Sequence, residues 1–427
     1  MIKVEEHKEP QHDLKSERYF SPKKLYLPLS QHTGAPATVC VQKGDVVDEA
    51  SLLAKESGFI SAQVHAPVKG KIVNIDKWYH PNLKKAQCIV MQPEGEKKKY
   101  TLAKDVESLG KDEILEIIKN SGVVGMGGAA FPTHVKLNPP KKIDTFIING
   151  CECEPYLATD NRLMIENTQE ILKGVEIVSK LIEPKEIIFA VEKNKPEAIR
   201  RINLTINTKK FNLPKIKLVT LNSTYPQGGE KQLILATKGR KIPPKKLPLD
   251  VGCLVHNVAT CVAIYEAVCL GKPLIERLVS FCGGALVSPK NIWVKIGTTL
   301  RELFDEGILK FKTEPERIIS GGPMMGTALD NLNYPILKGT GGFLFLQKAT
   351  DWIEAPCIRC ARCVDVCPMN LVPLEYAKRV KKEKYESLND VNIVDCIECG
   401  CCTYTCPGKI PIGHYIKIGK AYAPKLK

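Results

Sequence analysis

The stretch IDTFIINGCECEP, residues 143–155, decides the fold of the central part of the chain. Its first half, IDTFIIN, is a mostly apolar run of strand length, which predicts a buried strand. Its second half is a polar loop from Asn149 to Glu154. A helical pattern precedes it (KDEILEIIKNSG) and another follows it (LMIENTQEILKGVEIVSKLI). The strands EIIFAVE and KIKLVTL come next, so the alternation predicts an α/β domain with a largely parallel sheet.

Two polar loops of this domain should open on one crevice. The loop from Asn149 to Glu154 begins where the strand TFII ends, and the loop from Asn222 to Glu230 begins where KLVTL ends. In open α/β sheets, ligands bind outside the carboxyl ends of the strands. The sequence therefore predicts a ligand site formed by both loops.

The flanking segments differ in composition from the centre. Residues 26–76 read as short strands separated by turns and predict a small all-β unit. Residues 277–347 return to strand-and-turn composition and predict a small mixed β domain. We expect four domains, at residues 1–105, 106–270, 271–348 and 349–427.

Length and composition indicate an ordinary globular protein. The 427 residues are 44% hydrophobic and 26% charged, which allows several domains with cores. We find no apolar run of about 18 residues and no leader pattern, so we expect a soluble chain that stays in the cytoplasm. The net charge of +15 comes from scattered lysines. It fits a solvated surface, or docking to an acidic redox carrier or an anionic membrane face, and no motif points to nucleic acid.

Nine of the 17 cysteines lie between residues 357 and 406, and eight of them form two runs of one pattern, CxxCxxCxxxCP. In this spacing, three thiolates of one run hold a [4Fe–4S] cluster and the fourth ligates the other cluster. The rule assigns two ligand sets: Cys357, Cys360, Cys363 and Cys406 for the first cluster, and Cys396, Cys399, Cys402 and Cys367 for the second. Zinc is the alternative, but it explains neither the third cysteine nor the repeated proline. Cys401 is expected to be a non-ligating thiol.

A glycine-rich segment, GMGGAAFPTHVK at residues 125–136, precedes the central strand. Its backbone amides can approach a phosphate closely. The pattern Gly125-x-Gly127-x-x-Ala130 also matches the dinucleotide fingerprint, with Glu152 about 20 residues further on. A helix rather than a strand precedes the segment, and Phe131-Pro132 interrupts any helix after it, so the fingerprint is the weaker interpretation.

Four motifs in one order carry a family resemblance. GMGGAAFPTHVK, NGCECEP, YPQGGE and HNVAT resemble the flavin- and NADH-binding subunit of respiratory complex I. The N-terminal unit resembles barrel-sandwich domains that carry biotin or lipoate, but Ser57-Gly58-Phe59 stands in place of their lysine, so we expect a structural or docking role. Together with the paired cysteine runs, these features resemble the C subunit of the Rnf-type ferredoxin:NAD oxidoreductase complex over residues 22–415.

The resemblance implies a fold and a set of site residues. The fold would combine a barrel-sandwich domain, an α/β flavin domain, a small β-grasp domain and a helical two-cluster ferredoxin domain. NADH would contact Phe131, Glu154 and Glu230. Lys136 and Glu152 are the expected catalytic residues, with Lys136 stabilising the anionic reduced flavin, although without the resemblance each reads as a surface salt bridge. The FMN site would comprise Gly125, Gly127, Gly128, Lys136, Asn149, Glu152, Tyr225, Gly228, Asn257 and Thr260.

The resemblance also implies a function. The chain would exchange hydride between NAD(H) and FMN, and pass single electrons through two [4Fe–4S] clusters to or from ferredoxin or an iron–sulfur subunit. It would be a peripheral subunit on the cytoplasmic side of the inner membrane, in a complex that couples electron transfer to ion translocation. A soluble cobalamin reductase of a bacterial microcompartment and a non-catalytic iron–sulfur scaffold are the alternatives.

Overall fold

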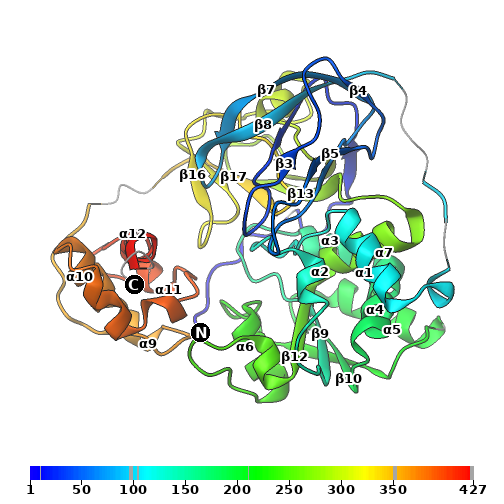
Figure 1. The fold of residues 1–427 in the computed structure, drawn as a ribbon. Coiled ribbons are helices and arrows are strands. Elements are labelled where there is room, and N and C mark those ends of the chain that lie inside the picture. Colours follow the sequence, from blue (N-terminus) through cyan, green and yellow to red (C-terminus); the bar gives the residue numbers. More distant parts are fainter. Residues whose placement is uncertain (10, 96–99, 103–104, 210, 350–352, 424–427) are drawn as a thin grey trace.

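The computed structural model describes residues 1–427 apart from residues 10, 96–99, 103–104, 210, 350–352 and 424–427. Figure 1 shows an α/β domain, two β-rich units on one side of it, and the cysteine-rich C-terminal part beside it. The predicted multidomain α/β class is thereby confirmed.

The α/β domain is built on a parallel sheet of four strands in the order β11-β10-β9-β12. The chain adds β10 and β11 on one side of β9, and then returns to place β12 on the other side. The strand order therefore reverses between β9 and β12, which is where open α/β sheets bind ligands. The strands are β9 (Thr145–Gly150), β10 (Glu186–Glu192), β11 (Ile216–Leu221) and β12 (Cys253–Asn257).

Helices cover both faces of this sheet. Successive side chains of β9 point to opposite faces, so they enter two different cores. Phe146 and Ile148 lie in one apolar core, with residues of α1, α4 and α7, whereas Ile147 lies in a second core with residues of α6. The run TFII is apolar at successive positions because both faces are buried. The helices are α1 (Lys111–Asn120), α2 (Thr133–Lys136), α3 (Thr159–Glu166), α4 (Thr168–Ile182), α5 (Pro196–Thr208), α6 (Glu230–Lys238) and α7 (Val258–Leu270), with the short 3-10 turns η1 (Val106–Ser108) and η2 (Pro248–Val251).

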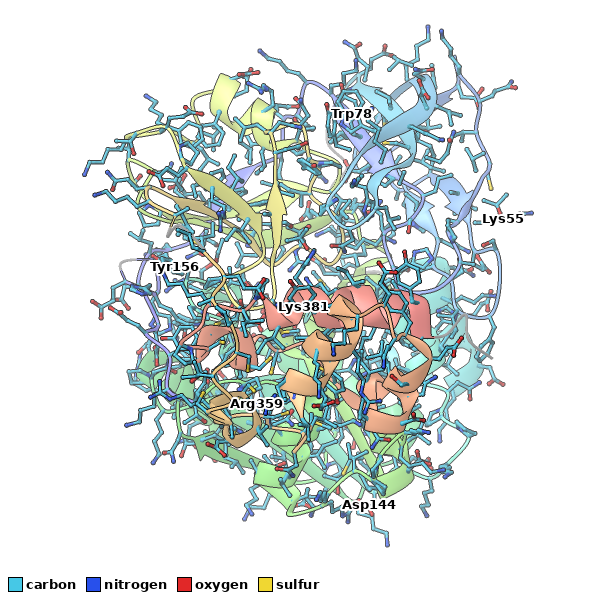
Figure 2. The ribbon with its side chains drawn as sticks, turned by 90° about the vertical axis from the view of Figure 1, so that its left-hand side faces the viewer. Lys55, Trp78, Asp144, Tyr156, Arg359 and Lys381 are labelled. Atoms are coloured by element: carbon cyan, nitrogen blue, oxygen red, sulfur yellow. The ribbon has the colours of Figure 1, made fainter. Side chains whose placement is uncertain are left out.

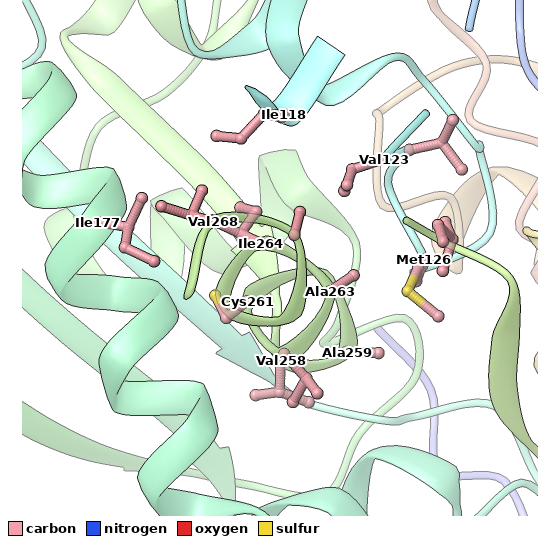
Figure 3. Packing of buried hydrophobic residues seen from close by; sticks show 14 of the residues in the cluster. Ile118, Val123, Met126, Ile177, Val258, Ala259, Cys261, Ala263, Ile264 and Val268 are labelled. Atoms are coloured by element: carbon pink, nitrogen blue, oxygen red, sulfur yellow. The ribbon is translucent and has the colours of Figure 1, made fainter. Parts of the chain in front are cut away.

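Helix α7 lies in the middle of the first core and is apolar on nearly every side, as buried helices are. Figure 3 shows its residues, among them Cys261 and Val268, close to Ile177 of α4 and Ile118 of α1. Gly174 lets α4 approach α7, since a Cβ at Gly174 would lie 2.0 Å from the carbonyl oxygen of Cys261.

The N-terminal unit is all-β, as predicted. Its two small sheets have the strand orders β2-β8-β7-β4 and β3-β5-β6. Its buried residues Leu53 and Val64 belong to the same apolar cluster as Ile118 and Val123 of the α/β domain, so the two units share a core. The strands are β2 (Leu25–Pro28), β3 (Thr38–Val39), β4 (Val46–Val47), β5 (Leu52–Lys55), β6 (Val64–His65), β7 (Gly70–His80) and β8 (Lys84–Pro93).

The third unit is a mixed sheet of six strands in the order β1-β14-β13-β17-β15-β16. Its edge strand β1 (Glu17–Tyr19) comes from the N-terminal segment and pairs in parallel with β14. The sheet therefore takes a strand from outside residues 271–348, which the sequence pattern did not indicate. The other elements are β13 (Glu276–Cys282), β14 (Lys290–Lys295), α8 (Leu300–Asp305), β15 (Arg317–Ser320), β16 (Thr327–Leu329) and β17 (Gly342–Leu346).

The segment before β1 runs along the α/β domain. Ile2 exchanges backbone hydrogen bonds with Tyr225 (2.9 and 2.8 Å), and the carbonyl of Glu6 accepts one from the N–H of Tyr156 (2.8 Å). The buried amine of Lys8 donates to the carbonyl of Leu157 (2.7 Å) and to that of Glu152. This segment therefore joins the α/β domain to the third unit.

The C-terminal part consists of short helices around the cysteine runs. Helices α9 (Arg362–Asp365) and α11 (Cys401–Tyr404) occupy equivalent places in the two runs, and α10 (Pro373–Lys381) contacts α12 (Ile412–Tyr422). The pattern LVPLEYAKRVKKEKYESLND at residues 371–390 predicts one spacer helix between the two cysteine runs. The observed helix is shorter: α10 ends at Lys381, and η3 (Glu386–Val391) and η4 (Ile393–Asp395) follow. Glu383 has a φ of 54°, which interrupts a right-handed helix. Among the described residues, no helix is both long and apolar enough to cross a membrane.

Replacing Gly174 with alanine should destabilise the protein by about 2 kcal/mol, because the added methyl group overlaps the Cys261 carbonyl. At an ordinary helix position the same change stabilises a protein by about 1 kcal/mol. The melting temperature, measured anaerobically, should fall for Gly174→Ala and change little for Gln169→Ala on the exposed side of α4. A higher melting temperature for Gly174→Ala would contradict the close contact.

Candidate functional site

The reversal of strand order brings Asn149 and Asn257 side by side. Asn149, near the end of β9, is the register partner of Asn257, the last residue of β12. The Asn149 side chain accepts a hydrogen bond from the N–H of Cys151 (3.0 Å) and donates one to the carbonyl of Gly228 (2.9 Å). The loops after β9 and β11 therefore meet at one edge of the sheet, as the sequence predicted.

The glycine-rich loop closes on itself beside this edge. The N–H of Gly125 donates to the carbonyl of Phe131 (2.8 Å), and the N–H of Met126 donates to the hydroxyl of Thr260 on α7 (2.9 Å). A Cβ at Gly127 would lie 3.2 Å from the Cβ of Asn257, so this part of the loop lies against the start of α7. Gly128 has a φ of +118°, which favours glycine. Phe131 itself is half-buried.

The start of α7 makes the site suitable for an anion. Asn257 caps the helix by accepting a hydrogen bond from the N–H of Ala259 (2.8 Å), and the helix dipole puts partial positive charge at this end. Gly127 and Gly128 are exposed, so a ligand can reach their backbone. Exposed glycine amides beside a helix N-terminus are a common phosphate site, and these residues fit the phosphate of a flavin nucleotide.

Lys136 and Glu230 form an ion pair at the side of the crevice. The Nζ of Lys136 lies 2.6 Å from Oε1 of Glu230, and the side chains are 30% and 37% exposed. Lys136 ends α2 and Glu230 begins α6, so the pair connects the segment after the glycine-rich loop to the loop after β11. Buried His256 lies near enough for the Lys136 charge, together with burial as the larger cause, to hold its pKa well below its usual range.

Glu152 binds the start of α3. Its carboxylate is buried and accepts hydrogen bonds from the Thr159 hydroxyl (2.9 Å) and from the N–H groups of Asp160 (3.1 Å) and Asn161 (3.4 Å). Glu152 therefore caps the first turn of α3. Its position in the NGCECEP motif did not indicate this structural role.

Asp160 is a site residue that the sequence analysis missed. Its Oδ2 accepts a hydrogen bond from Nδ2 of Asn257 (2.6 Å), the residue that caps α7. Burial, with the nearby Glu152 carboxylate as a smaller cause, raises the pKa of Asp160 to about 7. A perturbed carboxyl at a ligand crevice is typical of functional sites. Asp160 lies between NGCECEP and the helical pattern that begins at Leu163, so only its place in the fold identifies it.

Glu154 and Tyr225 lie at the contact with the cysteine-rich domain. The carboxylate of Glu154 accepts hydrogen bonds from the N–H groups of Met324 (2.7 Å) and Met325 (3.1 Å) and from the hydroxyl of Tyr225 (3.3 Å). Burial raises the pKa of Glu154 above its usual range. Tyr225 is only 1% exposed and packs in one apolar cluster with Cys399 and Cys401. The structure thus places these two residues between the α/β domain and the second cysteine run.

Cysteines of both runs line one cavity in the C-terminal part. Five of them line it, together with Tyr376 and Ile416: Cys367, Cys396, Cys399, Cys401 and Cys402. Cys367 belongs to the first run and the others to the second, so the cavity is lined by sulfurs of both runs. In the part of the chain that the structure describes, no three potential ligands converge on one point as they would around a single metal ion.

The other four cysteines lie closer to solvent. Cys357 and Cys360 are exposed, whereas Cys363 and Cys406 are partly buried. Burial raises the pKa of the Cys363 thiol, and the nearby Cys406 and Cys357 raise it further. Cys401 is fully buried and hydrogen-bonded to Cys399.

Three family models match consecutive parts of the chain. Residues 2–96 match the RnfC barrel sandwich hybrid domain, residues 118–266 match the Nuo51 FMN-binding domain, and residues 356–410 match a 4Fe-4S dicluster domain. A crystal structure of an NAD+-reducing [NiFe]-hydrogenase aligns with a TM-score of 0.49 and 16% identity, covering 74% of this chain and 61% of that chain.

Curated relatives match most of the chain. The C subunit of the proton-translocating ferredoxin:NAD(+) oxidoreductase complex of Clostridium ljungdahlii is 45% identical over 86% of this chain and 81% of its own length. The C subunit of the Na(+)-translocating ferredoxin:NAD(+) oxidoreductase complex of Acetobacterium woodii is 38% identical over 86% of this chain and 84% of its own length. With a flavin-type crevice, paired cysteine runs and these relatives, the chain belongs to the family of C subunits of ion-translocating ferredoxin:NAD oxidoreductase complexes.

Proposed function

We propose that this chain transfers electrons between NAD(H) and ferredoxin, as the FMN- and iron–sulfur-binding C subunit of an ion-translocating complex. The observation that carries the proposal is the contact between its two sites. Tyr225, in the loop after β11, packs against Cys399 of the second cysteine run. A nucleotide-type crevice and a cavity lined by cysteines of both runs thus share one interface, and the relatives are named for this reaction.

FMN, when bound, supplies the conversion between hydride transfer and single-electron transfer, because pyridine nucleotides carry two electrons and iron–sulfur clusters carry one. Gly127, Gly128 and the start of α7 would hold its phosphate. Asn149 and Gly228, which are hydrogen-bonded to each other, would line its ring or ribityl chain. Lys136, paired with Glu230, would lie beside the flavin.

The burial of the two cysteine sets supports an order for the electron path. The set around Cys399 lies at the contact with the α/β domain, so the second cluster would exchange electrons with the flavin. Cys357 and Cys360 are exposed, so the first cluster would face the redox partner. The same exposed stretch carries Arg359 and Arg362, and basic residues around an outlet favour an acidic partner. Figure 2 shows Arg359 on this domain.

We place the chain on the cytoplasmic side of the inner membrane as a peripheral subunit. Its family consists of subunits of ion-translocating complexes, and an acidic iron–sulfur subunit or ferredoxin fits the basic outlet. The cobalamin reductase alternative gains no support from the site or from the relatives described above. The scaffold alternative requires a crevice that no longer binds FMN, which the next experiment tests.

Lys136→Met should lower the midpoint potential of bound FMN by roughly 30 mV, which is about 1.4 kcal/mol for a two-electron couple. The physical reason is that the anionic reduced flavin loses a nearby cation. Anaerobic redox titration of the FMN-reconstituted protein measures the shift. Lys142→Met, in the exposed loop after α2, is the control and should leave the potential unchanged. If Lys136→Met also leaves it unchanged, the role given to Lys136 is wrong, and failure of FMN to bind at all supports the scaffold.

Single Cys→Ser variants should separate the two clusters by electron paramagnetic resonance. Cys367 and Cys402 line the same cavity, although they belong to different runs. Cys367→Ser and Cys402→Ser should therefore perturb the same cluster signal. Cys406→Ser should perturb the other signal. If instead Cys367→Ser perturbs the signal that depends on Cys363, each run holds its own cluster and the crossed assignment is refuted.

The double variant Arg359→Gln and Arg362→Gln should slow electron exchange with an acidic ferredoxin and weaken its dependence on salt, because steering charge at the outlet is lost. Stopped-flow measurements at low and high ionic strength test this, with cluster content checked by spectroscopy. Arg301→Gln, on α8 of the third unit, is the matched control. Equal rates for all three proteins with ferredoxin would exclude the first cluster as the outlet.

A further inference from the structure

The glycine-rich loop is held from outside its own domain. The hydroxyl of Thr33, in the barrel-sandwich domain, donates a hydrogen bond to the carbonyl of Ala129 (2.6 Å), and the N–H of Thr33 donates one to the carbonyl of Ala130 (3.1 Å). Ala130 has a φ of 49°, a conformation that residues other than glycine seldom adopt. Two hydrogen bonds from a neighbouring domain thus fix the least favourable backbone position of the loop.

The segment that carries Thr33 is itself tightly fixed. The N–H of Ala35 donates to the carbonyl of Ile60 (3.0 Å), and Nε2 of His32 lies 3.2 Å from the hydroxyl of Ser61. A Cβ at Gly34 would lie 2.0 Å from the Ile60 carbonyl oxygen, which shows how closely the two loops approach. The hairpin tip at residues 57–61 therefore supports Thr33 rather than presenting a lysine.

The third unit contacts the same loop. A Cβ at Gly339 would lie 3.2 Å from the Cβ of Ala130 and 3.6 Å from the carbonyl oxygen of Gly128. The neighbouring Lys338 is fully buried and donates to the carbonyl of Gly122, just before the loop (2.7 Å), and to that of Gln63 in the barrel-sandwich domain. Both β-rich units therefore fix the loop, while Gly127, Gly128 and Ala129 remain exposed.

We propose that the barrel-sandwich domain acts as a clamp that sets the glycine-rich loop in its phosphate-binding shape, with Thr33 as the positioning residue. The inference rests on the proposed function in that the ligand is FMN. This role does not require a prosthetic group on the barrel-sandwich domain. A loop that is ordered before the ligand arrives binds more tightly, because less conformational freedom is lost on binding.

Hydrogen exchange of the protein without FMN tests the clamp directly. Thr33→Val removes the hydroxyl bond to Ala129 and should speed amide exchange in residues 125–131 roughly tenfold, as loss of one hydrogen bond does. Thr33→Ser keeps the hydroxyl and should exchange like the wild type. Thr38→Val, on the exposed strand β3 of the same domain, is the control. Unchanged exchange in Thr33→Val, or equal acceleration throughout the protein, overturns the proposal.

FMN affinity, measured by flavin fluorescence during titration, supplies the second readout. The dissociation constant should rise roughly fivefold to tenfold in Thr33→Val and stay at the wild-type value in Thr33→Ser and Thr38→Val. If exchange changes but affinity does not, the clamp does not serve the flavin and the inference fails. If the wild type binds no FMN, the proposed function fails and the inference fails with it. If FMN binds normally but hydrogen exchange in Thr33→Val is unchanged, only the clamp is overturned.

Discussion

The reversal of strand order between β9 and β12 is the constraint on which the rest of the site depends. Because β12 lies next to β9, Asn257 lies beside Asn149, and α7 must begin at the edge where the loops after β9 and β11 meet. The glycine-rich loop then has a helix N-terminus to lie against, through Met126 and Thr260. A sheet that added its strands in one direction only would not create this position.

Buried charged groups hold the segments around the crevice. Glu152 caps α3 with its carboxylate, and its backbone carbonyl accepts a hydrogen bond from the amine of Lys8. Glu192 and Lys195 form an ion pair at 2.5 Å, and both side chains are almost fully buried. Removal of one member of such a pair leaves the other charge buried without compensation, which is strongly destabilising. An acidic residue of the NGCECEP motif thus helps to fix the shape of the site through its contacts with α3.

The sequence pattern predicted the structural features that depend on residues close together in the chain. The run TFII identified a strand buried on both faces. The repeated CxxCxxCxxxCP spacing grouped Cys367 with Cys396, Cys399 and Cys402, and these four line one cavity together with Cys401. Pattern could not show that Glu152 caps a helix, that Asp160 binds Asn257, or that Lys8 reaches the loop after β9. Each of these depends on a partner distant in sequence or on the direction of a side chain. The spacer helix was overestimated because helix propensity in KRVKKEKY does not reveal the left-handed Glu383.

The path of the N-terminal segment affects the order in which the chain completes its fold. Ile2 pairs with Tyr225, and both Ile2 and Val4 pack in the cluster that contains Cys399 and Cys401. Ribosomes release the N-terminus first, so these residues leave the ribosome long before their last partners are translated. Contacts between residues so distant in sequence also form slowly. Ile2 and Val4 can therefore dock fully only after the second cysteine run has been synthesised.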